Sequence, residues 1–445
     1  MSHYHGWRRG DESLFWCAPA QTTAVNAAAR YDSVHVGIHV HNKATPVAIR
    51  RQNTATLGLC NLYSAHVNPL SLDAPSHQKA VVVDPPVVLA PMAGVTNAAF
   101  RQLCYEQGAG LCVCEMLTAQ GLVMGNDHSA DMLTFASTEP IRSVQLYGSD
   151  PDALWVAVGI AIESFGAQHI DLNFGCPVPK VTRRGGGGAL PWKINLTRAL
   201  IESAVQSANR FGVPVTVKTR IGIDDSHPTY LDVARLAEDA GVAAICLHAR
   251  TVAQAYAGKA DWAAIANLVG VVDIPVLGNG DIWEGADAVA MINQTGCAGV
   301  EIGRGALGRP WLFADIVAAL AGQPKRTLPD LGQVCDLLRR HARLLTDVMG
   351  EWHAMKDIRK HTGWYLKGFP VGGDTRLALS SVTTLAELDD LLVGLDQQAP
   401  FPIAELGRPR GRQGSPRGHV ILPHGWLDDR DGVGLSINDE EVDGG

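Results

Sequence analysis

Residues 171–180 read Asp-Leu-Asn-Phe-Gly-Cys-Pro-Val-Pro-Lys, and in the middle of this stretch a strand pattern stops abruptly. The apolar run up to Asn173 predicts a buried strand over residues 169–173. Gly175 and the two prolines that follow can neither continue a strand nor open a regular helix. We therefore expect Cys176 on a stiff loop just beyond the carboxyl end of a strand.

The segment behind Cys176 is basic and then rich in glycine. Lys180 and Arg183 are followed by four consecutive glycines at residues 185–188. This composition predicts a mobile flap over the thiol, because glycine leaves the backbone unrestrained. Two interpretations stay open from these residues alone. The thiol is a reactive group under a flap, or it is a small buried core residue, as free cysteine usually is.

Seven further apolar runs of the same kind surround this strand, and most are followed by a helical pattern. The eight runs are residues 87–90, 111–115, 141–146, 169–173, 213–220, 242–248, 274–279 and 299–302. Eight strand–helix repeats in about 230 residues predict an α/β fold, a (β/α)₈ TIM barrel. A doubly wound open sheet is the alternative, but no G-x-G-x-x-G motif follows the first strand.

Residues suited to binding or catalysis, most of them polar, stand at the carboxyl ends of all eight predicted strands, where barrel enzymes place their chemistry. They are Met92, Glu115, Gln145, Asn173, Cys176, Lys218, Arg220, His248, Arg250, Asn279, Asp281, Gly303 and Arg304. Any one of them could be a structural capping group. A set that covers every strand end favours a functional site.

The last two predicted strands end in glycine-rich loops that suit a phosphate. Glycine lets the backbone approach an anion closely, and Arg304 adds a fork of donors. Tight turns are the alternative for these glycines. Together with Met92, Ala93 and Gln145, the loops suit a flavin mononucleotide (FMN) lying across the barrel mouth. Lys218 would then stabilise the reduced flavin ring.

Composition narrows the class of protein. The 445 residues carry a net charge of −8 and are 46% hydrophobic, which argues against a uniformly basic nucleic-acid binder. No apolar run reaches the roughly 18–20 residues that cross a bilayer, and no signal peptide pattern opens the chain. Nine scattered cysteines predict reduced thiols, a cytoplasmic location and no metal site.

Composition and hydrophobic pattern divide the chain into four parts. Residues 1–80 predict a largely disordered extension, whose histidines at 35–41 are a weak metal pattern, and residues 81–322 predict the barrel. Residues 323–398 predict a smaller all-helical domain, with helices over 331–348, 352–366 and 385–395. Between residues 325 and 376 ten Lys or Arg outnumber six Asp or Glu, so this domain offers a basic surface. Residues 399–445 predict a C-terminal tail.

Seven motifs in order resemble those of the tRNA-dihydrouridine synthases, most of all the bacterial B-type branch. They begin at Pro91, Gln145, Asp171, Val217, His248, Gly278 and Ile302, and the last reads Ile-Gly-Arg-Gly. The run Arg359-Lys360-His361 resembles the RNA-binding helical domain of that branch. The resemblance covers residues 81–395. It departs from the family at Ala249, where glycine is usual, and in the glycine run at 185–188.

The resemblance implies an enzyme that binds FMN, takes electrons from NADPH and reduces uridine in tRNA, with no membrane and no stable protein partner. Hydride would go to C6 of uracil and Cys176 would give a proton to C5; an ordinary thiol, with a pKa of about 8.5, carries that proton at pH 7. The implied cofactor residues are Pro91, Met92, Ala93, Gln145, Lys218, His248, Asn279, Gly280, Asp281, Gly303 and Arg304. The implied substrate residues are Asn173, Arg220, Arg250, Lys180, Arg183, Arg359 and Lys360.

Two other classes of function stay open. The barrel motifs alone allow an FMN oxidoreductase that acts on free pyrimidines or dihydroorotate, for which the basic helical domain has no use. A non-catalytic RNA-binding protein on a barrel scaffold would bind no flavin.

Overall fold

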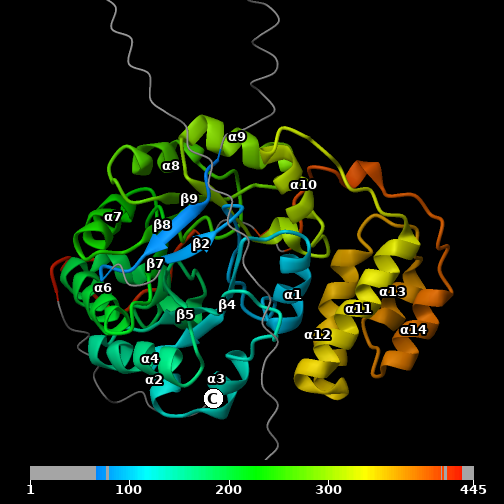
Figure 1. Cartoon of the computed structure of the whole chain (residues 1–445), viewed down its shortest axis with the longest axis horizontal. Coiled ribbons are helices and arrows are strands. Elements are labelled where there is room, and N and C mark those ends of the chain that lie inside the picture. Colours follow the sequence, from blue (N-terminus) through cyan, green and yellow to red (C-terminus); the bar gives the residue numbers. More distant parts are fainter. Residues whose placement is uncertain (1–66, 77–79, 412, 415–417, 433–445) are drawn as a thin grey trace, which may run out of the picture. The chain divides into compact units, whose positions relative to one another are not determined.

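The computed structural model of the chain describes residues 67–76, 80–411, 413–414 and 418–432 (Figure 1). In this part of the chain eight parallel strands close into a barrel in the order β10-β3-β4-β5-β6-β7-β8-β9. They are β3 (Val87–Leu89), β4 (Leu111–Thr118), β5 (Ser143–Tyr147), β6 (His169–Phe174), β7 (Val215–Arg220), β8 (Ala244–His248), β9 (Val276–Asn279) and β10 (Gly299–Ile302). The predicted barrel is confirmed, and the open sheet is excluded.

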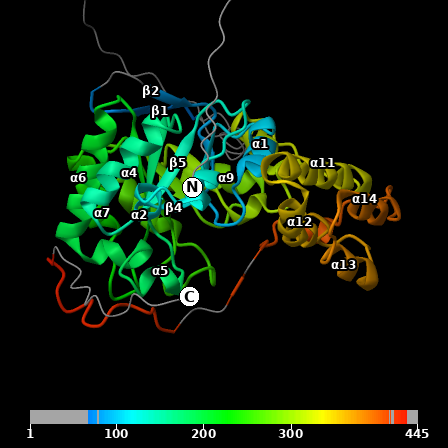
Figure 2. The ribbon, with the colours of Figure 1, turned by 90° about the horizontal axis from the view of Figure 1, so that it is seen from below.

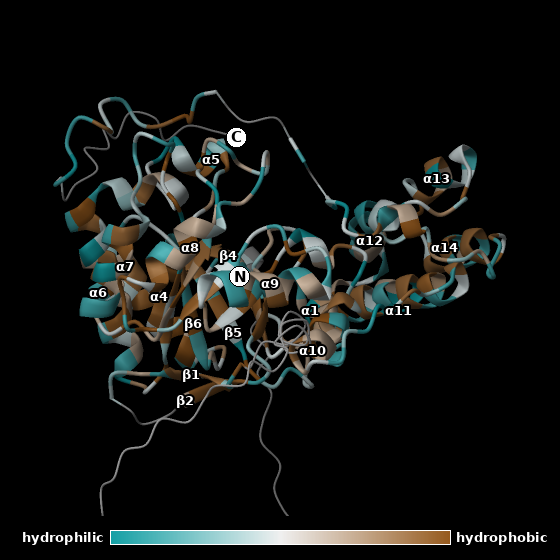
Figure 3. Ribbon diagram, turned by 90° about the horizontal axis from the view of Figure 1, so that it is seen from above, coloured by the Kyte–Doolittle hydropathy of each residue, from teal (hydrophilic) through white to brown (hydrophobic). Residues whose placement is uncertain are grey.

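Helices follow the strands and cover the outside of the barrel. They are α1 (Ala98–Glu106), α2 (Ala119–Val123), α3 (Asp127–Met132), α4 (Pro151–Glu163), α6 (Ile194–Asn209), α7 (Tyr230–Asp239), α8 (Trp262–Val269), α9 (Gly285–Thr295) and α10 (Leu312–Leu320). Local sequence sets their starts: the Asn97 side chain accepts from the Phe100 N–H, and Asp150 caps α4 ahead of Pro151. Figure 3 shows apolar strands inside and hydrophilic helix faces outside, as a barrel requires.

A hairpin closes the amino-terminal end of the barrel. Strands β1 (Leu70–Asp73) and β2 (Ala80–Val83) pair in antiparallel fashion, and Leu70 and Leu72 are buried against strand residues such as Val88. The extension expected over residues 1–80 therefore ends within a structural element of the barrel. The rest of that expectation, including the histidines at 35–41, lies outside the described residues.

Helices α11 (Leu331–Met349), α12 (Glu351–Tyr365), α13 (Gly373–Leu379) and α14 (Leu385–Val393) form the region after the barrel (Figure 2). Asp330 and Gln333 form a capping box at the start of α11. The helices share a core of their own, which Ala99 of α1 joins. The three predicted helices are confirmed. Helix α13 was not expected, because it begins at the second of two glycines; the domain boundaries stay a prediction.

The C-terminal segment does not leave the barrel as a free tail over its described part. Val420 and Trp426 are buried in a cluster with Ile223 and Val252. Figure 2 shows this red segment along the side of the barrel that carries α5 (Pro179–Thr182). None of the helices in the described ranges is long and apolar enough to span a membrane.

Candidate active site

A cavity of about 410 Å³ opens at the carboxyl ends of the barrel strands, a size typical of small-molecule sites. Most residues that the sequence places in a site line it. They are Pro91, Met92, Ala93, Asn173, Cys176, Lys218, Arg220, His248, Asn279, Gly280, Asp281, Gly303 and Arg304. The barrel thus brings together residues that are up to about 210 positions apart in sequence.

Lys218, at the end of β7, is held by acceptors from two other strands. Its ammonium group forms an ion pair with Glu301 of β10 and donates to Asn279 Oδ1 at 3.2 Å. Burial alone would lower the pKa of Lys218. Cys246 and Glu301 raise this pKa by more than burial lowers it, so the pKa lies above its ordinary value. Because burial raises the pKa of Cys246 as well, that thiol is neutral near pH 7, and Glu301 is the group that keeps Lys218 charged.

Glu301 was not predicted as a site residue. It is the single charge in the strand Gly-Val-Glu-Ile, and its side chain is buried. A buried charge needs a partner, so its position in an apolar strand was a usable signal. Three aromatic residues that line the cavity were also missed, namely Tyr256, Trp283 and Trp364. The first two lie in loops, and Trp364 comes from α12, so no strand pattern points to them.

The backbone around Cys176 is held from inside the barrel. Asn173 Oδ1 accepts the N–H groups of Gly175 and Cys176, each at 3.0 Å. Its amide nitrogen donates to Gln145 Oε1 at 2.9 Å, and Gln145 Nε2 donates to Asp171 at 2.6 Å. This series of hydrogen bonds fixes the orientation of the Asn173 amide and, through it, the turn that carries the thiol.

Gln145 thus has a different place from the predicted one. It is 1% exposed and, among the described residues, is not one that lines the cavity. Both ends of its amide are engaged one layer below the mouth. In this structure its amide holds Asn173, and its contact with a cofactor stays a prediction.

The expected flap is also contradicted. Pro179 occupies the first turn of the short helix α5, where its missing N–H is tolerated. The glycines at 185–188 are buried, and the last two of them begin a 3₁₀ helix, Gly187–Trp192. A Cβ atom at Gly187 would lie 2.7 Å from the Cys176 carbonyl oxygen, and one at Gly188 would lie 2.3 Å from Val252 Cγ2. These glycines permit close packing and do not provide mobility.

The two buried arginines that were predicted to bind substrate, Arg220 and Arg250, hold loops. Arg220 lines the cavity, but it donates to the carbonyl oxygens of Gly175 at 2.7 Å, Thr251 at 3.0 Å and Ala255 at 2.8 Å. Burial lowers the pKa of Arg220 to about 10, so it stays charged at neutral pH. It ties the Cys176 loop to the loop after β8.

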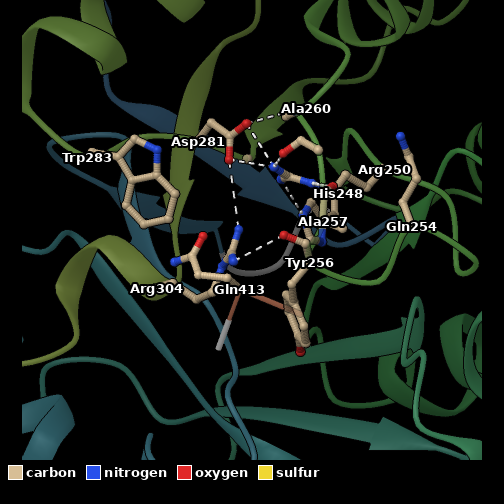
Figure 4. A network of polar contacts seen from close by, with 12 residues as sticks. His248, Arg250, Gln254, Tyr256, Ala257, Ala260, Asp281, Trp283, Arg304 and Gln413 are labelled. Carbon is tan, nitrogen blue, oxygen red and sulfur yellow. Dashed lines mark hydrogen bonds and ion pairs between the residues drawn. The ribbon is translucent and has the colours of Figure 1, made fainter. Parts of the chain in front are cut away.

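Arg250, expected to contact substrate, is 1% exposed and lies outside the set of cavity-lining residues. It donates to the carbonyl oxygens of Ala257 and Gly258 and to both carboxylate oxygens of Asp281 at 2.7 and 2.8 Å (Figure 4). It therefore positions Asp281, which adopts the left-handed backbone conformation with φ 56°. Beside it, burial and then the charge of Arg220 lower the pKa of His248 far below its usual value, so the imidazole is neutral.

The ends of β9 and β10 leave room for an anion. Gly303 lines the cavity, and a Cβ atom there would meet no atom closer than those of Ala90 and Met92, 3.8 and 3.9 Å away. The guanidinium group of Arg304 stacks on the rings of Tyr256 and Trp283 at 5.0 and 5.2 Å (Figure 4). Burial and then the positive charge of Arg250 lower the pKa of Arg304. The carboxylate of Asp281, 3.8 Å from the Arg304 guanidinium group, acts in the opposite direction. The space at Gly303 and the guanidinium group of Arg304 together suit a phosphate.

Four other basic residues predicted to bind substrate do not line the cavity, namely Lys180, Arg183, Arg359 and Lys360. Lys180 and Arg183 are exposed at α5. Arg359 donates to the carbonyl oxygen of Val382 at 2.9 Å and so holds the loop before α14. Lys360 forms an ion pair with Asp357 and lies beside Gly94 of the barrel rim.

A closed barrel with charged and glycine-rich strand ends around one cavity defines an α/β-barrel enzyme. The model of the dihydrouridine synthase (Dus) family matches residues 88–399, and the chain belongs to this family. The family resemblance of the sequence is therefore confirmed.

Its relatives include two mycobacterial proteins and one B-type protein. The chain is 55% identical to a probable tRNA-dihydrouridine synthase of Mycobacterium tuberculosis (strain CDC 1551 / Oshkosh), over 78% of this chain and 90% of that protein. It is 51% identical to the probable tRNA-dihydrouridine synthase of Mycobacterium leprae (strain TN), over 80% of this chain and the whole of that protein. It is 38% identical to tRNA-dihydrouridine synthase B of Xanthomonas axonopodis pv. citri (strain 306), over 68% of this chain and 90% of that protein.

Proposed function

We propose that this chain reduces specific uridines of tRNA to 5,6-dihydrouridine, with bound FMN as cofactor and NADPH as reductant. The observation that best supports this function is the set of residues that line one cavity. The thiol of Cys176 and the charged Lys218 lie around the same space as the anion-fitting corner at Gly303 and Arg304. The family match supports the substrate, because it continues past the barrel through the basic helical region.

The residues present fit a flavin mononucleotide. Its phosphate would lie against Gly303 and Arg304, and Gly280 and Asn279 would line its approach. Lys218 would face the ring edge that becomes anionic on reduction, with its charge maintained by Glu301. When bound, FMN supplies the hydride for C6 of uracil. Further residues would pack against the cofactor, namely Pro91, Met92, Ala93, His248 and Asp281.

Cys176 completes the reduction with a proton. As C6 gains hydride, the S–H bond breaks and a C5–H bond forms, so the C5–C6 double bond becomes single. The thiolate left behind takes a proton from solvent. Asn173 and Arg220 hold the turn on both sides of the thiol, which keeps the donor in one position.

The tRNA would contact the rim of the cavity. The target base must leave its stack to reach the thiol. Lys180 and Arg183 on one side of the mouth and Lys360 on another are exposed and would bind phosphates, with Arg359 holding the loop beside them. Arg250 would act on the substrate only indirectly, through Asp281.

The test compares Cys176→Ala with Cys335→Ala, a matched variant in the helical core away from the cavity. We expect Cys176→Ala to keep the visible flavin spectrum and tRNA binding but to lose dihydrouridine formation, whereas Cys335→Ala stays active. Full activity of Cys176→Ala would overturn the acid assignment. Equal turnover of free pyrimidines and tRNA, or a purified protein without flavin absorbance, would overturn the proposed substrate or the cofactor.

A further inference from the structure

The C-terminal residues 418–432, here named the strap, lie against the segment that carries the buried glycines. Trp426 of the strap is 5% exposed. Its indole N–H donates to the Ala189 carbonyl oxygen at 3.0 Å. At Gly185 the ring lies so close that a Cβ atom would stand 2.3 Å from it. The ring therefore covers a position that only glycine can occupy.

The strap is held along its length by the residues that follow the glycines. The Trp192 indole N–H donates to the Leu427 carbonyl oxygen at 3.3 Å, and the Ile194 N–H donates to the Arg430 carbonyl oxygen at 3.0 Å. Lys193 is buried, donates to the Asp429 carbonyl oxygen and stacks on the Trp426 ring at 5.0 Å. A buried lysine directed at the strap is a specific contact and not a chance one.

One charged residue of the strap, Arg430, completes the attachment. Arg430 stacks on the Trp192 ring at 4.8 Å and forms an ion pair with Asp232 of α7. The Lys193–Trp426 and Arg430–Trp192 pairs cross, since each cation contacts the aromatic ring of the other segment. Cation–π pairs of this kind contribute about 0.5–2 kcal/mol each, so the strap is anchored at several points.

The covered segment holds Cys176 on its other side. The Gly188 N–H donates to the Cys176 carbonyl oxygen at 3.0 Å. Gly187 lies so near that a Cβ atom there would be 2.9 Å from Cys176 Cβ. From Trp426 through residues 185–189 to Cys176, each layer is in direct contact with the next. Removal of the outermost layer therefore frees the segment that fixes the thiol.

We infer that Trp426 is a positioning residue for the active-site thiol, and that the strap, through residues 185–189, holds the Cys176 loop in place. The family match ends at residue 399, so the strap lies outside the part of the chain that this match covers. The inference rests on the proposed function only in calling Cys176 the proton donor. The contact itself is independent of that role.

The experiment measures how fast iodoacetamide alkylates Cys176 in the full-length flavin-bound protein, by mass spectrometry of the peptide that contains it. We expect Trp426→Ala to raise the rate about tenfold, because local opening exposes the thiol. Trp426→Phe keeps a ring over Gly185 and loses the bond to Ala189, so its rate lies between. Ile421→Ala is the matched control, since this strap residue is exposed and its loss leaves the rate unchanged.

Activity gives a second readout. For Trp426→Ala, kcat for dihydrouridine formation falls about tenfold while KM for tRNA and flavin content stay as in the parent protein, because a misplaced acid affects the chemical step. Alkylation at the parental rate in Trp426→Ala would overturn the inference. If that variant does not fold, Trp426→Phe decides: an increase in its alkylation rate supports the inference, and an unchanged rate overturns it.

The acid role of Cys176 and the positioning role of Trp426 can be refuted independently of each other. Should Cys176→Ala remain fully active while Trp426→Ala still accelerates alkylation, the acid assignment is wrong and the positioning by the strap holds. Should Cys176→Ala be inactive and Trp426→Ala change neither rate, the acid assignment holds and the role of Trp426 is refuted.

Discussion

Replacement of Gly188 by alanine tests whether the glycine run is packed or mobile. In a mobile flap, Gly→Ala is neutral or stabilises the protein by about 0.4–1 kcal/mol, because it restricts the unfolded chain. In this structure the new Cβ atom would lie 2.3 Å from Val252 Cγ2, far inside the 3.5–4.0 Å at which two carbon atoms rest. The sign of the stability change therefore separates the two descriptions.

The expected magnitude follows from the contact. Val252 is fully buried and cannot turn away, so relief requires a shift of the backbone. Added methyl groups in packed cores lower the free energy of unfolding by about 1–3 kcal/mol. Gly188 is outside the left-handed backbone region, so backbone strain adds nothing to this value. Val252→Ala removes the methyl groups that clash, and the double variant should lose at least about 1 kcal/mol less than the sum of the single variants.

The assay is urea unfolding followed by tryptophan fluorescence, with Gly363→Ala as the control. Gly363 is exposed in α12 with no atom within 4 Å of an added Cβ atom, so alanine there should stabilise by up to about 1 kcal/mol. Dihydrouridine formation by Gly188→Ala should fall as well, because Gly188 holds the Cys176 carbonyl group. An unchanged or higher stability of Gly188→Ala, with no coupling to Val252, would refute the packed description.

Two further predictions concern buried charges. Lys218→Met leaves the carboxylate of Glu301 buried without its cation and should lower the free energy of unfolding of the flavin-free protein by about 3–5 kcal/mol. Adding Glu301→Gln to this variant should restore most of the stability but not flavin binding. A loss below about 1 kcal/mol in the single variant would contradict the prediction. Burial raises the pKa of Asp171 from its usual 3.8 to about 7, so between these values the folded protein keeps a proton that the unfolded chain has lost. The free energy of unfolding should therefore fall as pH rises from about 4 to about 7, and Asp171→Asn, compared by thermal denaturation at both ends of this range, should show a smaller fall.

The sequence predicts the barrel well because its signals are local and repeated. Each strand is a short, mainly apolar run that is buried on both faces, and most strands end at or just before a polar residue. The hairpin β1–β2 and the short helix α13 were not predicted. A strand of four residues, or a helix that begins with glycine, has too few residues for a periodic pattern, and tertiary packing stabilises both.

Some of the site residues could likewise be predicted from local patterns, and others could not. Lys218, Asn279 and Gly303 were predicted from strand ends, and the closed barrel brings them around one cavity. Sequence spacing does not show depth, however, so it could not tell Gln145, one layer below the mouth, from Asn173 at the mouth. Nor could it show that the donors of Arg250 are taken by loop carbonyl groups.

The glycines at 185–188 show most clearly why composition alone led to the wrong prediction of a mobile flap. Glycine is common both where a chain must move and where another group must come close, and only the partner distinguishes the two cases. That partner, Trp426, is about 240 residues away in a segment whose composition is typical of a tail. The contact was therefore invisible to any local pattern.

A fixed thiol has a consequence for how the substrate enters. Asn173 holds the Cys176 turn from below, Arg220 holds it from the side, and the segment under Trp426 holds it from outside. A loop held from three directions does not open to admit a base. Under the proposed function, the conformational change on binding must then occur in the RNA, which extrudes its uridine into a cavity that is already formed. The ordering of the proton donor takes place when the protein folds, so the binding energy of tRNA is available to unstack the base.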